Sequence, residues 1–309
     1  MFVFRHFTFL LMLIAFITSG VACSLKSPPE DNSGAPFNNP GSNRTDILLF
    51  SGSSIWKLEA ASIRQILYAH GATYRTVGDD ELNAMEQADF KKYKALVIPG
   101  GDAEVVTSKL YNETRRKIRL AVNDDGLNYL GFCAGAWLAI APNPPEGWAH
   151  SYGIGFVDAP LQEHTVYYRR DQQEVLLTAH YPDGQTRKQL WFGGPVTPNV
   201  PGGVIARYPD GKPAITQFII DNSLIILSAL HPTADKAMLS AINLYQIEAI
   251  TPDVAWELLD SVINKKLLPA FDSENGTIKP VVPKNIKLSN SSNFNFNAIF
   301  NNPSQDFNR

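Results

Sequence analysis

A single cysteine between small residues is the strongest candidate for chemistry in this sequence. Cys133 lies in the run Gly131-Phe-Cys-Ala-Gly135, which follows an apolar segment and leads into a helix-like stretch that ends at Ile140. This order predicts a strand, a tight turn and a helix, with small residues that let the backbones approach closely. Such a turn would place the thiol at a helix N-terminus, where the helix dipole favours a thiolate. A buried structural cysteine in an ordinary strand–helix unit is the alternative.

Two further groups follow apolar runs that have the character of buried strands. Gly100 and Gly101 follow one run, and His231 comes shortly after another. Because ligands of doubly wound α/β folds bind at the carboxyl ends of the strands, we expect these groups to lie near Cys133. A thiol nucleophile needs a nearby base, and a developing oxyanion needs backbone donors. His231 is therefore the candidate base, and the amides of Gly100, Gly101 and Ala134 are the candidate oxyanion donors.

Apolar runs alternate with helix-like segments along the first half of the chain. A short apolar run bounded by turn residues predicts a buried strand, and apolar residues at helical spacing predict an amphipathic helix. Repeated alternation of the two predicts a doubly wound α/β domain with a mainly parallel sheet. The predicted strands are 46–50, 73–77 and 95–98, followed by the Cys133 unit, and the predicted helices are 56–70 and 107–125.

The middle of the chain, from about 150 to 220, changes character because the helical spacing fades. Short β-type runs follow one another there, and turn pairs such as Asp183-Gly and Asp210-Gly separate some of them. We therefore expect an antiparallel β extension carried on the main sheet. The predicted elements of this part and the next are strands at 166–168, 175–178, 190–192, 204–208 and 214–220, a central strand at 223–228, and closing helices at about 233–247 and 253–267.

Residues 1–22 have the pattern of an export signal and not of a folded element. A thin polar start is followed by an apolar run that is too short for a comfortable membrane span. Small residues then directly precede Cys23, which resembles the lipobox of bacterial lipoproteins, in which the cysteine is acylated and becomes the first mature residue. Ordinary secretory cleavage near Ala22 is the alternative. Residues 23–45 are rich in Pro, Gly, Ser and Asn, as is typical of a flexible tether.

The composition narrows the classes of function. A formal net charge of −3 without a long basic run gives nucleic-acid binding no electrostatic support. Two cysteines cannot form a disulfide framework, and we expect neither a metal ion nor a cofactor. The folded domain is expected at 46–268, and the Asn- and Ser-rich segment 269–309 is expected to be a tail that is either disordered or loosely docked. The oligomeric state is left open.

Together these motifs resemble the class I glutamine amidotransferase superfamily and, more narrowly, the biotin-protein ligase N-terminal-like family. The resemblance runs in family order over about 46–235 and implies a flavodoxin-like fold. It also implies that Cys133 is the nucleophile, that His231 is the base, and that Gly101 and Ala134 donate to the oxyanion. The matching phrases are Phe50-Ser-Gly52, Val97-Ile-Pro-Gly-Gly101, Leu130-Gly-Phe-Cys-Ala-Gly135, Phe192-Gly-Gly-Pro195, Ala206-Arg-Tyr208 and Leu227-Ser-Ala-Leu-His-Pro232.

One departure from the family pattern concerns the residue after the His-Pro pair. The family usually continues with Glu, whose carboxylate orients the histidine, whereas this chain has Thr233. A hydroxyl can accept a hydrogen bond but carries no charge that would stabilise an imidazolium. Loss of the orienting acid typically weakens a catalytic triad greatly. Asp235 and Glu104 are the candidates for a substitute acid, and the sequence does not choose between them.

Two functions from different classes follow from this pattern. The first is a cysteine-dependent amidohydrolase or amidotransferase that acts on a C–N bond of a small amide or peptide through Cys133 and His231. The second is a non-catalytic module that binds a ligand or a partner on the same fold. The chain has no biotin-ligase catalytic domain, so biotin ligation is not predicted. Lipidation of Cys23 would anchor either kind of protein in the cell envelope, at the outer membrane and facing the periplasm.

Overall fold

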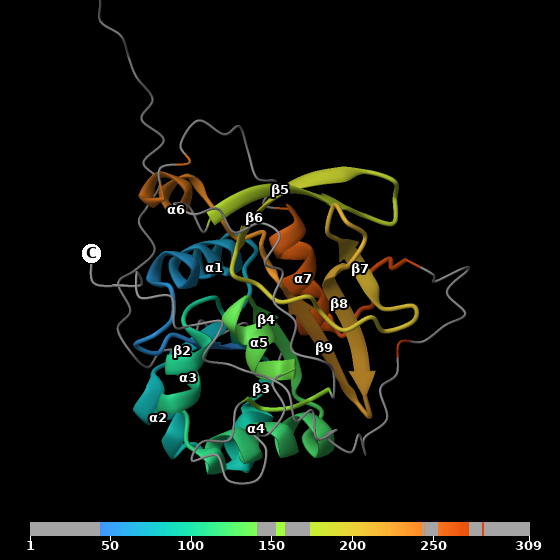
Figure 1. The fold of residues 1–309 in the computed structure, drawn as a ribbon. Helices are drawn as coiled ribbons and strands as arrows, with labels where there is room; N and C mark the ends of the chain where they lie inside the picture. Colours follow the sequence, from blue (N-terminus) through green and yellow to red (C-terminus); the bar gives the residue numbers. More distant parts are fainter. Residues whose placement is uncertain are drawn as a thin grey trace, which may run out of the picture.

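A computed structural model describes residues 44–140, 153–157, 174–242, 244, 253–271 and 280. The strands in these segments form one ten-stranded mixed sheet, with helices on both faces (Figure 1). The predicted doubly wound α/β architecture with an antiparallel extension is confirmed. The strands are β1 (Thr45–Phe50), β2 (Tyr74–Val77), β3 (Tyr93–Ile98), β4 (Asn128–Phe132), β5 (Glu174–His180), β6 (Thr186–Phe192), β7 (Val204–Arg207), β8 (Pro213–Ile220), β9 (Ser223–Ser228) and β10 (Leu230–His231).

The helices divide between the two faces of the sheet, as a doubly wound fold requires. Side chains of α1 and α7 join one buried cluster, and side chains of α2, α3, α4 and α5 join the other. The short helix α6 packs against β6 and α1 in a smaller cluster of its own. The helices are α1 (Lys57–Ala69), α2 (Asp79–Ala84), the 3₁₀ helix η1 (Gln87–Lys92), α3 (Ala103–Lys109), α4 (Asn112–Asp125), α5 (Ala134–Ile140), α6 (Lys236–Ala241) and α7 (Asp253–Asn264).

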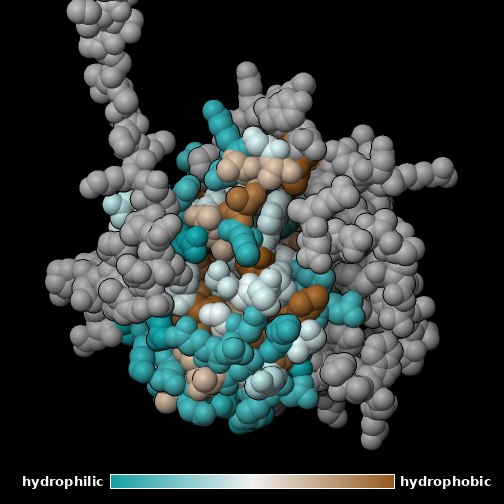
Figure 2. All heavy atoms as spheres, turned by 90° about the vertical axis from the view of Figure 1, so that its left-hand side faces the viewer, coloured by the Kyte–Doolittle hydropathy of each residue, from teal (hydrophilic) through white to brown (hydrophobic). Residues whose placement is uncertain are grey.

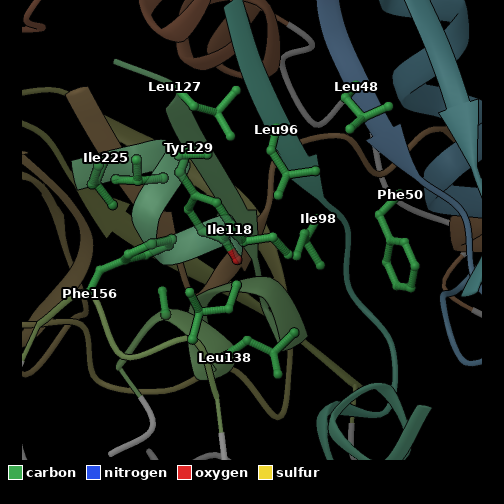
Figure 3. Close-up of a cluster of buried hydrophobic side chains, with 14 of the residues drawn as sticks. Leu48, Phe50, Leu96, Ile98, Ile118, Leu127, Tyr129, Leu138, Phe156 and Ile225 are labelled. Carbon is green, nitrogen blue, oxygen red and sulfur yellow. The ribbon is translucent and has the colours of Figure 1, made fainter. Parts of the chain in front are cut away.

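The parallel core has the strand order β2-β1-β3-β4-β9. Its central strands are nearly continuous apolar runs because both faces are covered by helices. Successive residues of β1 show this directly: Leu48 and Phe50 enter the cluster with α2 to α5, and Ile47 and Leu49 enter the cluster with α1 and α7. Figure 3 shows how side chains from several strands meet in the first of these clusters around Tyr129.

The antiparallel extension returns to the carboxyl edge of the parallel core. Its strand order is β10-β6-β5-β7-β8-β9, and only Ala229 separates β9 from β10 in the chain. The first and last strands of this order are therefore consecutive, so the extension folds back on itself at β9 and β10. His231 pairs with Leu190 of β6 in this arrangement. The extension thus brings β6 and the segment after it to the end of β4, where Cys133 lies.

The turn between β4 and α5 is tight because small residues let the helix lie against the sheet. A Cβ atom at Gly135 would lie 2.2 Å from the carbonyl oxygen of Ile98, and one at Gly131 would lie 2.4 Å from the carbonyl carbon of Gly135. The Tyr129 hydroxyl of β4 donates to the Gly135 carbonyl at 2.7 Å and so ties α5 to the sheet. Cys133, at the corner, has φ of +42°, a strained conformation for a residue with a side chain.

Some predicted helices differ in their bounds. The segment 107–125 contains the end of α3 and the whole of α4, with a break between them. Asn83 of α2 bridges this break: its side-chain nitrogen donates to the Lys109 carbonyl at 2.9 Å, and its side-chain oxygen accepts from the Tyr111 amide at 3.0 Å. Helices α2 and η1 were not expected. Helix α6 begins at Lys236, later than predicted, because the Asp235 carboxylate accepts from the Met238 amide and caps it. Helix α7 ends at Asn264 because Lys265 has φ of +52°.

Several expectations fall outside the described residues: the export signal 1–22, Cys23, nearly all of the tether, the strand at 166–168 and most of the tail 269–309. Within the described residues, no helix is long and apolar enough to cross a membrane. Figure 2 shows the face that bears α1, α2 and α3: its lower part is hydrophilic, and small hydrophobic patches lie above it.

We predict that Gly135→Ala lowers the free energy of unfolding by about 1–3 kcal/mol, the usual cost of overpacking a core. In an open helix the same change would stabilise the protein by up to about 1 kcal/mol, so the clash with Ile98 decides the sign. Gly78→Ala is the matched control, because a Cβ there meets no atom within 4 Å. Urea denaturation of both variants measures the effect, and equal stabilities would contradict the close packing of α5 on β3.

Candidate functional site

Cys133 is positioned by the end of β4 and the start of α5. Its amide donates to the Ser228 carbonyl of β9 at 2.7 Å, which fixes the backbone of the turn to the neighbouring strand. The side chain is only 5% exposed. Its thiol donates to the Phe192 carbonyl at 3.1 Å, so the extension supplies the hydrogen-bond partner of the sulfur in this conformation.

His231 is the second side chain that the fold brings to this corner. It lies on β10, is 1% exposed, and its Nδ1 atom is 2.9 Å from Glu59 Oε1. Its Nε2 atom is buried and has no hydrogen-bond partner among the described residues. A histidine held at Nδ1 by a carboxylate and open at Nε2 has the arrangement of a base oriented by an acid.

Glu59 is the acid that faces His231, and it comes from the first turn of α1. The side chain is fully buried, which is rare for a glutamate without partners. It has three donors: the His231 ring, the Thr233 hydroxyl at 2.6 Å from Oε1, and the Gly100 amide at 2.5 Å from Oε2. The helix dipole also favours a negative charge in the first turn.

The charges of this pair shift both pKa values. Burial alone would lower the pKa of His231, but the charge of Glu59, the nearby Cys133 and the hydrogen bond with Glu59 raise it above its ordinary value. Burial alone would raise the pKa of Glu59, but the charge and hydrogen bond of His231 and the bonds from Thr233 and Gly100 lower it. The folded protein therefore favours protonated His231, which adds to the free energy of unfolding. This contribution is fully present below the ordinary pKa of imidazole and is lost as the pH rises through the raised pKa of His231.

The oxyanion donors need one correction. The Gly100 amide donates to Glu59, so it holds the acid and is not available to an oxyanion. Gly101 forms a bridge with Ile55, but the bonds that close the bridge use the amides of Trp56 and Asp102 and leave the Gly101 amide out. The Ala134 amide is the first of α5 and has no acceptor within the helix. Gly101 and Ala134 therefore remain candidate donors.

The acid that faces His231 is neither of the two candidates named from the sequence. Asp235 caps α6, and Glu104 lies in the first turn of α3 with its side chain exposed. Sequence reasoning missed Glu59 because it considered only residues near strand ends. A signal was present: Glu59 precedes the buried Ile63 by four residues, so a carboxylate occupies the core-facing stripe of α1.

Aromatic side chains lie beside His231 and along the segment after β6. The Trp56 ring packs edge-on against His231 at 5.6 Å and against Phe192 at 5.9 Å between ring centroids. The Trp137 indole nitrogen donates to the Gly193 carbonyl at 2.8 Å and holds the segment after β6 against α5. Within the described residues no group of three or more His, Cys, Asp or Glu is placed to hold a metal ion.

Comparison with known proteins gives one family match. Residues 45–142 match the family described as biotin-protein ligase, N terminal. The match covers the parallel strands β1 to β4 and the Cys133 turn, and it ends before the antiparallel extension and His231. No curated protein matches the chain.

Solved structures with a similar arrangement include three with low sequence identity. A glutamine amidotransferase is 16% identical, with a TM-score of 0.49, over 71% of this chain and 98% of that one. A protein provisionally named as a GMP synthase subunit, from Thermoplasma acidophilum, is 11% identical, with a TM-score of 0.45, over 72% of this chain and 96% of that one. A ThuA-like protein from Bacteroides uniformis is 11% identical, with a TM-score of 0.44, over 74% and 96%. The segment that carries the Cys133 turn is thus similar to the biotin-protein ligase N-terminal family.

Proposed function

We propose that the protein is a cysteine-dependent amidohydrolase or amidotransferase that acts on a C–N bond. The observation that carries this proposal is the combination of a strained Cys133 at a helix N-terminus with His231, whose Nδ1 is held by a buried carboxylate and whose Nε2 is unpaired among the described residues. A structural cysteine would need neither the positive φ nor a charged partner behind the histidine. Both features belong to an activated nucleophile.

The reaction would proceed through a thioester. The Cys133 thiol gives its proton to His231 Nε2, and the sulfur attacks the amide carbon while the amides of Gly101 and Ala134 bind the oxygen that becomes negative. When this intermediate collapses, the C–N bond breaks and the nitrogen leaves with the proton from His231. Water then attacks the thioester and returns a proton to the thiol through His231, or an amine takes the place of water in a transfer reaction.

The proposed substrate is a small amide or a peptide. The Trp56 ring packs against both His231 and Phe192, and aromatic rings of this kind suit the flat, partly apolar body of an amide. The ion pairs that Lys and Arg form among the described residues, such as Lys94–Asp46 and Arg116–Glu113, include neither Glu59 nor His231. A neutral acyl group next to the scissile bond is therefore the expected chemistry.

We predict that the full chain releases ammonia or an amine from a panel of primary amides and short peptide amides, and that Cys133→Ala reduces the rate at least about a thousandfold. Coupled ammonia detection and mass spectrometry of the products measure the reaction. Glu104→Gln is a suitable control because this exposed carboxylate lies outside the reactive group. Turnover that survives in Cys133→Ala would reject the cysteine mechanism.

We also predict that iodoacetamide labels Cys133 in the native protein at neutral pH and that His231→Ala slows the labelling severalfold. The imidazolium favours the reactive thiolate, and the helix dipole remains in both proteins. Peptide mapping by mass spectrometry separates Cys133 from Cys23. If labelling were slow until the protein is unfolded, Cys133 would be a structural residue.

A second candidate function is a non-catalytic module that binds a ligand or a partner at the same site. One observation favours it: the Cys133 thiol is only 5% exposed and donates to the Phe192 carbonyl and not to His231. Fast labelling that is indifferent to His231, without turnover of any amide, would select this function.

We propose in addition that the chain is an envelope lipoprotein, anchored through a lipidated Cys23 at the outer membrane and facing the periplasm. The support is the run of small residues directly before this cysteine and the Pro-, Gly-, Ser- and Asn-rich stretch after it. We predict that the mature N-terminal peptide begins at Cys23 and carries acyl chains, which mass spectrometry of that peptide detects. An unmodified peptide that begins elsewhere would contradict the proposal.

A further inference from the structure

We infer that the carboxylate that positions His231 belongs to Glu59 of α1. We further infer that Thr233, which stands where the family usually has the orienting glutamate, holds the Glu59 carboxylate by a hydrogen bond. The inference rests on the proposed function only in giving His231 the role of a base. It makes Glu59 and Thr233 positioning residues, since neither is expected to touch the substrate. It also means that the Thr after His-Pro does not mark a lost acid.

The contacts around Glu59 Oε1 carry the first step. His231 Nδ1 lies 2.9 Å from this oxygen, and the Thr233 hydroxyl donates to the same oxygen at 2.6 Å. One carboxylate oxygen thus joins the histidine to the residue two positions after it. Thr233 is almost fully buried, so its hydroxyl has been removed from water to make this contact. Its side chain therefore anchors the acid at the point where the acid meets the ring.

The other oxygen, Oε2, is held by the backbone. The Gly100 amide donates to it at 2.5 Å, and a Cβ atom at position 100 would lie 2.6 Å from this oxygen and 2.5 Å from the His231 Cε1 atom. Only glycine leaves room for the carboxylate and the ring together. Gly100 of the Pro-Gly-Gly turn after β3 therefore holds the Glu59 carboxylate and leaves room for the His231 ring. Gly101 of the same turn is the candidate oxyanion donor.

Helix α1 fixes Glu59 relative to Thr233 by a second contact. The Ser62 hydroxyl donates to the Thr233 carbonyl at 2.5 Å, and Ser62 lies on the same side of the helix as Glu59, three residues later. Two side chains of one helix therefore contact the hydroxyl and the carbonyl of Thr233. A carboxylate mounted on a helix and held by three donors is fixed more rigidly than one on a loop.

The charged groups that act on His231 come from two elements. Glu59 faces it from α1, and Cys133 faces it from the turn after β4. Trp56, which packs edge-on against the ring, and Leu190, which pairs with His231 from β6, carry no charge. A change of the carboxylate at position 59 should therefore appear directly in the titration of His231.

Four variants of the full chain test the inference. Glu59→Gln removes the charge and keeps the shape. Thr233→Val removes the hydroxyl and keeps the branched side chain. Thr233→Glu places a carboxylate after His-Pro, and it is made both alone and together with Glu59→Gln. Glu104→Gln, on an exposed carboxylate, is the control. The readout is the pKa of His231 from NMR titration of its ring, with iodoacetamide labelling of Cys133 as a function of pH.

In the wild type, His231 should titrate above the ordinary pKa of imidazole. Glu59→Gln should lower this pKa by about one to three units, the usual effect of removing an adjacent opposite charge. Thr233→Val should lower it by less, because the carboxylate stays but loses one donor. The double variant should recover most of the lost His231 pKa shift. Thr233→Glu alone should fold less stably than the wild type, because two carboxylates then share one site.

A wild-type His231 that titrates at or below the ordinary value would overturn the inference without any variant. So would a folded Glu59→Gln protein with an unchanged His231 pKa, or a folded double variant that recovers nothing. Glu104→Gln should leave the titration unchanged. These readouts use no substrate, so the inference can fail while amide turnover is observed, and it can hold in a protein that turns over no amide.

Discussion

The buried contact between Glu59 and His231 is the interaction on which the rest of the site depends. A carboxylate removed from water is costly unless its charge is matched and its lone pairs are occupied. Here the imidazole, a hydroxyl and a backbone amide all donate to it. Those donors come from β10, from the turn after it and from the turn after β3. One carboxylate thus fixes three separate segments against α1 at the carboxyl edge of the sheet.

The second constraint is the close approach of backbones around Cys133. Gly135 lies against the Ile98 carbonyl, and the Cys133 amide is bound to Ser228 of the next strand. These contacts hold the cysteine at a positive φ that an isolated turn would not keep. The parallel strands therefore set the position of the sulfur, while α1 sets the position of the histidine. The Cys133 turn packs against Ile98 of β3, and the Glu59 carboxylate is bound by Gly100 just after β3. Both the cysteine and the histidine are therefore positioned by this strand and its turn.

Much of the fold followed from local patterns, because buried parallel strands read as apolar runs and the small residues around Cys133 require a tight turn. Cys133 and His231 were found for this reason: each stands at or just beyond the end of such a run. Glu59 was not found, because its partners are more than 40 residues away in the sequence and only the packing of α1 brings them together. The break between α3 and α4 was missed for a similar reason, since the side chain that bridges it comes from Asn83 of another helix.

The antiparallel extension adds a further role to the site. It carries His231 and also presents the Phe192 carbonyl to the thiol of Cys133. A thiol that donates to this carbonyl does not donate to His231 Nε2, so the two acceptors compete for one proton. In the proposed reaction the thiol would turn from the Phe192 carbonyl to His231 Nε2, and catalytic hydrogen bonds often tighten only when substrate is bound.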